Sequence, residues 1–386
     1  MQTDLQEVLG QPSWRIASHE VEAFLTETGG HLGPVTFDVG GKKIQPFSVA
    51  PWAEESTAAD LPTMLKVLRG DFFCLPFGGN ATVFQGERHP PHGDTANLAW
   101  TLEGTSPGHL HLSLQTQARP GRVDKHVTLR PGHTAIYQRH VVSGMRGPMS
   151  FGHHAMLKFP DVPGSGVLST SRFRRGHVSP VPLEQATERG YSCLRPGAVF
   201  QSLERVPTQT GARTDLSRYP ARRGFEDLVL IETDERQHLA WTAVTFAEQG
   251  YVWFALKDPQ VLRQTIFWLS NGGRHYPPWD GRHINVLGIE DVTSYFHYGL
   301  AESAHANPLT AEGRMTTREL DPAHPLAIHY IIAVAPIPPD FDRLAAILPA
   351  ADGQSVELVS RNKLRVRTPL DVNFLGIERL PRKLVR

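Results

Sequence analysis

Hydrophobic and polar residues alternate with a period of two along much of this chain of 386 residues. Val21, Ala23 and Leu25 occupy every second position of segment 21–25, and Leu110, Leu112 and Leu114 do the same in segment 110–114. Side chains of an extended strand point alternately to its two faces. The pattern therefore predicts antiparallel sheet, and it continues in three later segments rich in Val, Ile, Trp and Thr: 227–232, 238–246 and 250–256.

Helical spacing occurs in two short segments. Leu61, Met64, Leu65 and Leu68 have the spacing of one helix face, and Phe341, Leu344, Ala345 and Leu348 repeat it, which predicts helices over 61–68 and 341–348. The 34 Gly and 31 Pro residues are scattered, as is typical of many turns. We find no repeat of fixed spacing, and the break at 163–166 is too short to separate domains. The pattern predicts one all-β domain over 1–386, with 1–16 as a candidate N-terminal extension.

Charge and cysteine content narrow the class of protein. The 39 basic and 39 acidic residues cancel and form no block, which argues against a sequence-independent nucleic-acid binder and a polybasic membrane surface. Segment 1–7 lacks the basic and apolar regions of a signal peptide, and the apolar stretch 330–338 is too short to span a bilayer. Cys74 and Cys193 form no C-x-x-C pair, so neither disulfides nor a structural zinc site is expected. We expect a cytoplasmic protein.

The first cluster of candidate functional residues lies in segment 88–100, RHPPHGDTANLAW. Two prolines impose an extended or turning backbone, and Gly93 allows a ligand to approach closely. An imidazole here could hydrogen-bond to a hydroxyl, and an indole could lie against the apolar face of a sugar. Each His alone is more often a surface loop residue, and His89-x-x-His92 is half of a metal site without a partner at a firm spacing. The candidates are Arg88, His92, Asn97 and Trp100.

The second cluster lies in segment 149–160, which contains Gly152-His153-His154. On a strand, His153 and its alternate neighbours Ala155, Leu157 and Phe159 would face the core, while His154, Met156 and Lys158 would share the other face. We therefore expect His154 and Lys158 on a solvated, concave side. An imidazole can give and take a proton near neutral pH, as general acid/base catalysis requires. A hydrogen-bonded structural His is the alternative.

The third cluster, segment 270–291, is the densest polar and aromatic stretch of the chain. Its Asn-Gly-Gly predicts a turn, and a Trp between two Arg residues is typical of a carbohydrate pocket, which makes candidates of Arg274, Trp279 and Arg282. Glu290 ends an apolar run, where burial can adapt a carboxylate to act as a base. A salt-bridged structural Glu is the alternative. Because Glu290 and Asp291 are adjacent on an expected strand, only one of them can reach a given pocket.

Taken in order, these segments resemble the aldose 1-epimerase (galactose mutarotase-like) family. That family has an Asn close after a Pro, a His-Gly before a Trp, a strand with a central His, and a late Leu-Glu-Pro. The corresponding segments here are Pro76–Asn80, His92-Gly93, Gly152–Leu157 and Gly288–Asp291, and Gly29–Val35 is similar to the family's first hairpin. The sequence departs from the family pattern at Ala81, Met156, Leu157 and Asp291.

The resemblance implies a β-supersandwich and a mutarotase-like isomerase that interconverts anomers of an aldose or sugar derivative without a cofactor or metal. It assigns Glu290 as the general base for the anomeric hydroxyl, His154 as the general acid for the ring oxygen, and His92 as a second His near that oxygen. With the clusters above, it gives these expected substrate contacts: Asn80, Arg88, Asn97, Trp100, Lys158, Arg274, Trp279 and Arg282.

Two other classes of protein remain open from the sequence. A carbohydrate-binding protein without turnover would keep the aromatic and Arg contacts but would not need both His154 and Glu290. A cupin-like metal enzyme is suggested by the 19 histidines. The expected partner is a monosaccharide or sugar derivative, bound by a monomer or homodimer.

Overall fold

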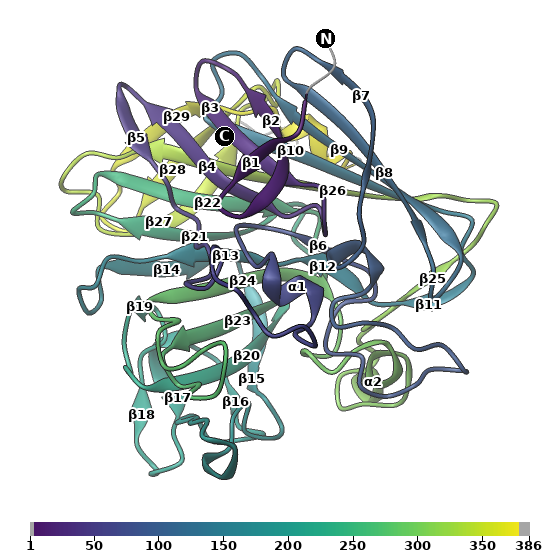
Figure 1. Cartoon of the computed structure of the whole chain (residues 1–386). Coiled ribbons are helices and arrows are strands. Elements are labelled where there is room, and N and C mark those ends of the chain that lie inside the picture. The colour runs from purple at the N-terminus through teal and green to yellow at the C-terminus, as the bar shows by residue number, and fades with distance from the viewer. Residues whose placement is uncertain (1–3, 378–386) are drawn as a thin grey trace.

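Two large antiparallel sheets pack face to face in the computed structural model, which describes residues 4–377 (Figure 1). The first has nine strands in the order β19-β14-β21-β22-β26-β10-β9-β8-β7. Its strands are β7 (Thr101–Ser106), β8 (His109–Thr116), β9 (Gly121–Leu129), β10 (Ala135–Ser143), β14 (Gly166–Thr170), β19 (Arg218–Tyr219), β21 (Ala240–Phe246), β22 (Tyr251–Lys257) and β26 (Leu326–Pro336).

The second large sheet has eight strands and carries most of the candidate site. Its order is β16-β15-β20-β23-β24-β12-β6, and β13 also pairs with β24. Its strands are β6 (Phe73–Cys74), β12 (Phe151–His153), β13 (Ala155–Lys158), β15 (Phe173–Val178), β16 (Val199–Phe200), β20 (Phe225–Thr233), β23 (Gln264–Asn271) and β24 (Val286–Thr293).

Smaller sheets complete the fold (Figure 1). A five-stranded sheet comprises β1 (Gln6–Val8), β2 (Gln11–Ala17), β3 (Val21–Thr26), β4 (Leu32–Val39) and β5 (Lys42–Ile44). A three-stranded sheet comprises β27 (Leu344–Pro349), β28 (Ser355–Ser360) and β29 (Arg365–Pro369). Two strand pairs join β11 (Gly147–Met149) to β25 (Arg318–Leu320) and β17 (Val206–Pro207) to β18 (Arg213–Thr214).

Helices are few and short. The α-helices are α1 (Thr63–Lys66) and α2 (Leu300–Ala304), and the 3-10 turns are η1 (Asp94–Ala96), η2 (Ala186–Glu188), η3 (Leu203–Arg205), η4 (Thr310–Glu312) and η5 (Val372–Leu375). Within residues 4–377, no helix has the length and apolar character needed to cross a membrane.

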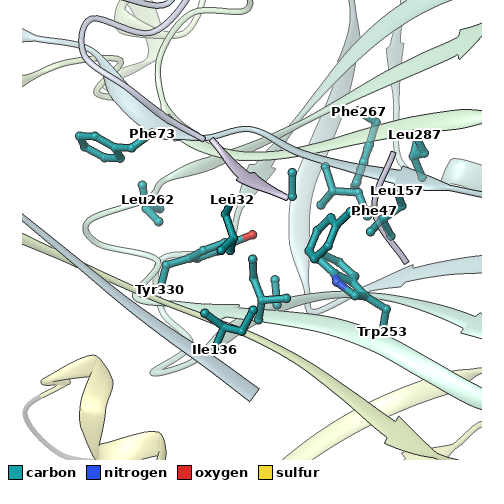
Figure 2. Packing of buried hydrophobic residues seen from close by; sticks show 14 of the residues in the cluster. Leu32, Phe47, Phe73, Ile136, Leu157, Trp253, Leu262, Phe267, Leu287 and Tyr330 are labelled. Atoms are coloured by element: carbon teal, nitrogen blue, oxygen red, sulfur yellow. The ribbon is translucent and has the colours of Figure 1, made fainter. Parts of the chain in front are cut away.

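The main core fills the space between the two large sheets. Trp253 and Tyr330 of the nine-stranded sheet are fully buried in one cluster with Phe267 and Leu287 of the eight-stranded sheet, and Trp253 contacts Phe47 between the sheets (Figure 2). Alternate residues of the same strands face outward into two further apolar clusters. One covers the outer face of the eight-stranded sheet with α1 and nearby loops, and the other packs the three-stranded sheet on the outer face of the nine-stranded sheet. Because both faces are covered, the central strands β21, β22, β23 and β24 are buried at every position, whereas β8 and β9 nearer the sheet edge alternate between buried and more exposed residues.

The predicted all-β architecture is confirmed. The strands expected at 21–25, 110–114, 227–232, 238–246 and 250–256 are present as β3, β8, β20, β21 and β22. The helix expected over 61–68 is the shorter α1. The prediction of a helix over 341–348 is wrong, because most of this segment belongs to the strand β27. A bulge between Leu344 and Ala346 lets Leu344 and Ile347 both face the core although they are three positions apart. One extra residue in a strand thus reproduces the spacing of a helix.

Candidate active site

Glu290 and Asp291 lie side by side on β24 and point to opposite faces of the sheet, as predicted. Asp291 faces the core between the sheets, where its Oδ1 lies 2.6 Å from Nζ of Lys257 and its Oδ2 accepts a hydrogen bond of 2.9 Å from the Tyr330 hydroxyl. Glu290 shares the outer face with Val286 and Val292. Only Glu290 can therefore contribute to a site on that face.

His154 reaches Glu290 from the single-residue link between β12 and β13. It directly precedes β13, which pairs with β24, and its Nε2 lies 3.2 Å from Oε1 of Glu290. The carboxylate fits beside Gly288, where an added Cβ would lie 2.8 Å from that oxygen. The predicted division of faces in segment 149–160 is confirmed, since Ala155 and Leu157 belong to the main core. The outer face is not solvated at Met156, which packs into the second apolar cluster.

His297 completes the group and was not predicted. It lies in the loop after β24, and its Nε2 makes a short hydrogen bond with Oε2 of Glu290. Its sequence context, Tyr295-Phe296-His297-Tyr298, has no strand or helix periodicity. The one available signal was a titratable residue among aromatic residues, seven positions after the candidate base.

His92 approaches from the loop before η1. Its backbone has a positive φ of 59°, and its N–H donates to the Gly78 carbonyl at 2.7 Å. Gly93 must be glycine, because a Cβ would lie 1.9 Å from the Leu75 carbonyl oxygen. The His92 ring centroid lies 5.1 Å from that of His154 and 5.6 Å from that of His297. We call His92, His154, Glu290 and His297 the His–Glu cluster.

Aromatic rings hold the imidazoles of the His–Glu cluster in place. Phe72 stacks on His154 with ring centroids 4.6 Å apart, and Phe77 contacts the rings of His92, His154 and His297. Burial lowers the pKa of His92 well below its usual value, and the neighbouring His154 and His297 lower it further. Burial also lowers the pKa of His154, although the Glu290 carboxylate opposes this shift.

The His–Glu cluster borders a pocket of about 280 Å³. All three imidazoles of the cluster line the pocket, whereas Glu290 is fully buried behind His154 and His297. The volume is close to the lower end of ligand pockets, about 300 Å³. The lining combines apolar residues near α1 with aromatic and polar ones from the eight-stranded sheet and its loops: Met64, Leu65, Leu68, Pro91, His92, His154, Trp268, Arg274, Tyr276, Trp279 and His297.

Arg274 and Trp279, both predicted, line this pocket and contact one another. The Arg274 Cζ lies 4.4 Å from the Trp279 ring centroid and 5.2 Å from that of Trp268. Its Nε donates to Oε1 of Glu184 at 2.6 Å. Behind them, Glu226 accepts a hydrogen bond of 2.8 Å from the Trp268 indole, and burial raises the pKa of Glu226 to about 7.

Six of the eight predicted substrate contacts do not line the pocket, which corrects that expectation, and four of these six lie in other parts of the fold. Trp100 is 2% exposed in the main core, where its indole donates to the Thr95 carbonyl. Lys158 is exposed as the last residue of β13. Arg282 pairs with Glu55 at the surface, and Arg88 lines a different groove.

Asn80 and Asn97 hold loops together and do not line the pocket. The Asn80 Nδ2 donates to the Pro90 carbonyl at 3.0 Å, and its Oδ1 accepts from the Leu300 N–H at 2.9 Å. It thereby links the loop of His92 to the segment that follows His297. Asn97 similarly accepts from the Met64 N–H at 2.9 Å and donates to the Pro91 carbonyl at 2.7 Å.

His89 and His92, the pair considered for metal binding, have different surroundings, and so do the adjacent His153 and His154. His89 hydrogen-bonds Glu87 at 2.8 Å, and His153 hydrogen-bonds Asp71 at 2.9 Å in the core. Over residues 4–377, one group of three side chains brings potential metal-binding atoms within 4.8 Å of one another, namely His154, Glu290 and His297.

Known proteins resemble this chain in structure but not in sequence. The sequence matches no family model and no curated protein. A candidate aldose 1-epimerase from Escherichia coli K12 superposes with a TM-score of 0.59 at 14% identity, over 85% of this chain and all of the other. A galactose mutarotase-like protein from Lactobacillus casei gives 0.54 at 9%, over 83% and 99%. A galactose mutarotase related enzyme from Lactobacillus acidophilus gives 0.53 at 11%, over 83% and 97%. These similarities show the galactose mutarotase-like β-sandwich fold.

Proposed function

We propose that the protein is a mutarotase-like isomerase that interconverts the anomers of an aldose or sugar derivative. The observation that carries the proposal is the position of Glu290 between His154 and His297 at a pocket of monosaccharide size. General acid/base catalysis on a sugar ring needs groups that move protons at two neighbouring oxygens. The His–Glu cluster offers two imidazoles at the pocket with one carboxylate between them.

Ring opening would proceed by two coupled proton transfers. Because Glu290 is fully buried, the anomeric hydroxyl proton passes to the pocket-facing nitrogen of His297, while Glu290 stabilises the resulting imidazolium. In molecules in which His154 is protonated, a fraction that burial lowers and the Glu290 carboxylate raises, its imidazolium gives a proton to the ring oxygen as the bond from that oxygen to C1 breaks. Rotation about C1–C2 and the reverse transfers close the ring as the other anomer. Protons and electrons balance over the cycle, and no cofactor takes part.

The rest of the pocket suits a sugar with an apolar face. Trp268 and Trp279 offer aromatic surface on the sheet side, and Met64 and Leu65 offer aliphatic surface near α1. The guanidinium of Arg274, held by Glu184 and by the two indoles, is available to donate to a hydroxyl or an acidic substituent. His92 lies next to both catalytic imidazoles, where it can hydrogen-bond the ring oxygen or a neighbouring hydroxyl.

The test is a panel of freshly dissolved pure anomers, comprising neutral aldoses, deoxy sugars, uronic acids and sugar phosphates. Polarimetry and proton NMR would follow equilibration with and without the protein. We expect the protein to accelerate the equilibration of at least one sugar of the panel, with a rate that saturates as the concentration of that sugar rises. Binding without acceleration across the panel would instead favour a carbohydrate-binding protein. Neither binding nor acceleration would refute the proposed function.

A further inference from the structure

Glu290 lacks a fixed cation. It is 0% exposed, and within residues 4–377 its side-chain hydrogen bonds and ion pairs are to two imidazoles, those of His154 and His297. Asp291, its neighbour on β24, is by contrast paired with Lys257. A carboxylate removed from water is costly unless a positive charge or several hydrogen bonds compensate for it. A positive ion bound beside Glu290 would therefore stabilise its buried carboxylate, and no Lys or Arg side chain provides that charge within residues 4–377.

We propose that His154, Glu290 and His297 bind a divalent transition-metal ion such as zinc. Two imidazoles and a carboxylate are a ligand set used by zinc and by other first-row metal ions. One ring nitrogen from each His and one carboxylate oxygen lie within 4.8 Å of one another. Ligand atoms about 2.0–2.2 Å from a shared tetrahedral ion are roughly 3.4 Å apart, and Nε2 of His154 is 3.2 Å from Oε1 of Glu290. Nε2 of His297 makes a short hydrogen bond with Oε2 of Glu290, so an ion would replace the proton of that hydrogen bond and these two atoms would move apart.

The surroundings of these three side chains favour an ion that the protein holds firmly and that still has one coordination position open to the pocket. Phe72 stacks on His154, and Phe77 contacts both His154 and His297, so the rings are oriented before an ion arrives. Both imidazoles also line the pocket. A fourth ligand, either water or an oxygen of a bound molecule, can therefore reach an ion between them. Three protein ligands with one open position are the arrangement of catalytic rather than structural zinc sites.

This inference goes beyond the proposed isomerase and does not depend on it. An ion bound here would occupy the atoms that the proposed proton transfers use. The metal-bound and proton-transferring forms of the protein would then exclude one another.

Metal titration of the full-length protein tests the inference without an activity assay. After dialysis against a chelator, the protein would be titrated with Zn²⁺ and followed by calorimetry. A second titration with Co²⁺ would be followed by visible absorption, which is strong when the bound Co²⁺ has few ligands. We expect one ion per chain and a higher Tm with Zn²⁺. Glu290→Gln and His297→Gln should each weaken Zn²⁺ binding at least about 100-fold. Replacing a residue that only hydrogen-bonds to a metal ligand already lowers metal affinity by about 10–100-fold.

His126→Gln is the matched control. His126 stacks on His111 on the outer part of the nine-stranded sheet, away from the His–Glu cluster, and its replacement should leave the titration unchanged. His297 is partly exposed, so its variant should fold even if Glu290→Gln does not. No stoichiometric ion in the wild type, or equal binding by His297→Gln, would overturn the inference. Loss of binding in His126→Gln would also overturn it, because the ion would then lie elsewhere.

Discussion

Nε2 of His154 lies 3.2 Å from Oε1 of Glu290, although the strands β13 to β23 separate the two residues along the chain. Strand pairing brings them together. β13 runs antiparallel to β24 with Met156 opposite Gly288, so the next outward-facing position on each strand is His154 and Glu290. The register of two neighbouring strands thus places an acid/base pair on one face of the sheet, and a one-residue shift would separate the pair.

Gly288→Ala should impair the proposed activity, because the glycine leaves space for the carboxylate. The added methyl would lie 2.8 Å from Oε1 of Glu290 and 3.0 Å from Cβ of Trp268, so one of them must move. We expect a fall in kcat of at least about tenfold, since a shift of about 1 Å can cost 10²-fold. The measurement is kcat on the sugar found by the panel.

Gly104→Ala is the control for this substitution. A Cβ at Gly104 meets no atom within 4 Å, and its backbone does not have the positive φ that disfavours alanine. It should retain wild-type kcat. Equal kcat values for Gly288→Ala and Gly104→Ala would show that the position of the Glu290 carboxylate does not limit turnover.

Asn80→Ala should loosen the connection between the loops of His92 and His297. The substitution removes the acceptor for the Leu300 N–H and the donor to the Pro90 carbonyl. Buried groups left without partners cost about 1–3 kcal/mol each. We expect a lower Tm and faster hydrogen exchange of the Leu300 amide.

Asn80→Asp separates the two effects, because it keeps the acceptor oxygen and loses the donor. Slow exchange at Leu300 should therefore persist in Asn80→Asp and disappear in Asn80→Ala. If both variants exchanged as slowly as the wild type, Asn80 would not hold these loops together.

Glu226 should make the protein less stable as the pH rises. Its pKa is about 7 in the folded protein, against an ordinary value of 4.5, mainly because it is buried. Between these two values the folded state binds more protons than the unfolded state, so the free energy of unfolding falls with increasing pH. The fall approaches about 3 kcal/mol for a shift of this size.

The measurement is denaturant unfolding at pH 5 and pH 8 for the wild type and for Glu226→Gln. The glutamine cannot ionise, so the difference between the two pH values should shrink by roughly this amount. The same pH difference in both proteins would mean that Glu226 does not titrate in the folded state.

The sequence was informative wherever a strand imposes its period of two. That period correctly assigned the faces of His154 and Met156 and the opposite directions of Glu290 and Asp291. It carried no information on His297, which lies in a loop positioned by backbone hydrogen bonds to Gly79 and Asn80 from a distant part of the chain.

Composition alone was a weaker guide to the site. Trp100 and Arg282 occur in segments that look like sugar-binding loops, yet one fills the core and the other pairs with Glu55. Such residues serve packing and surface ion pairs as readily as binding, and only tertiary contacts distinguish these uses. The strand β27 was missed for a similar reason, because a bulge gives Leu344 and Ile347 the spacing of a helix.

Glu290 and Asp291 have different proposed roles: Glu290 drives proton transfer, and Asp291 supports the fold. Replacing Asp291 weakens its pairing with Lys257 and Tyr330 in the core, so Asp291→Asn should lower stability but leave kcat per folded molecule largely intact. Replacing Glu290 keeps the shape but removes the charge between the two imidazoles.

The most direct measurement is therefore the rate of anomerisation by Glu290→Gln and Asp291→Asn on the same sugar, with sugar binding measured in parallel. This role of Glu290 predicts that Glu290→Gln lowers kcat by about 10²–10⁴-fold while still binding the sugar, and that Asp291→Asn retains most of its kcat. A larger loss in Asp291→Asn than in Glu290→Gln, or unchanged turnover in Glu290→Gln, would contradict it.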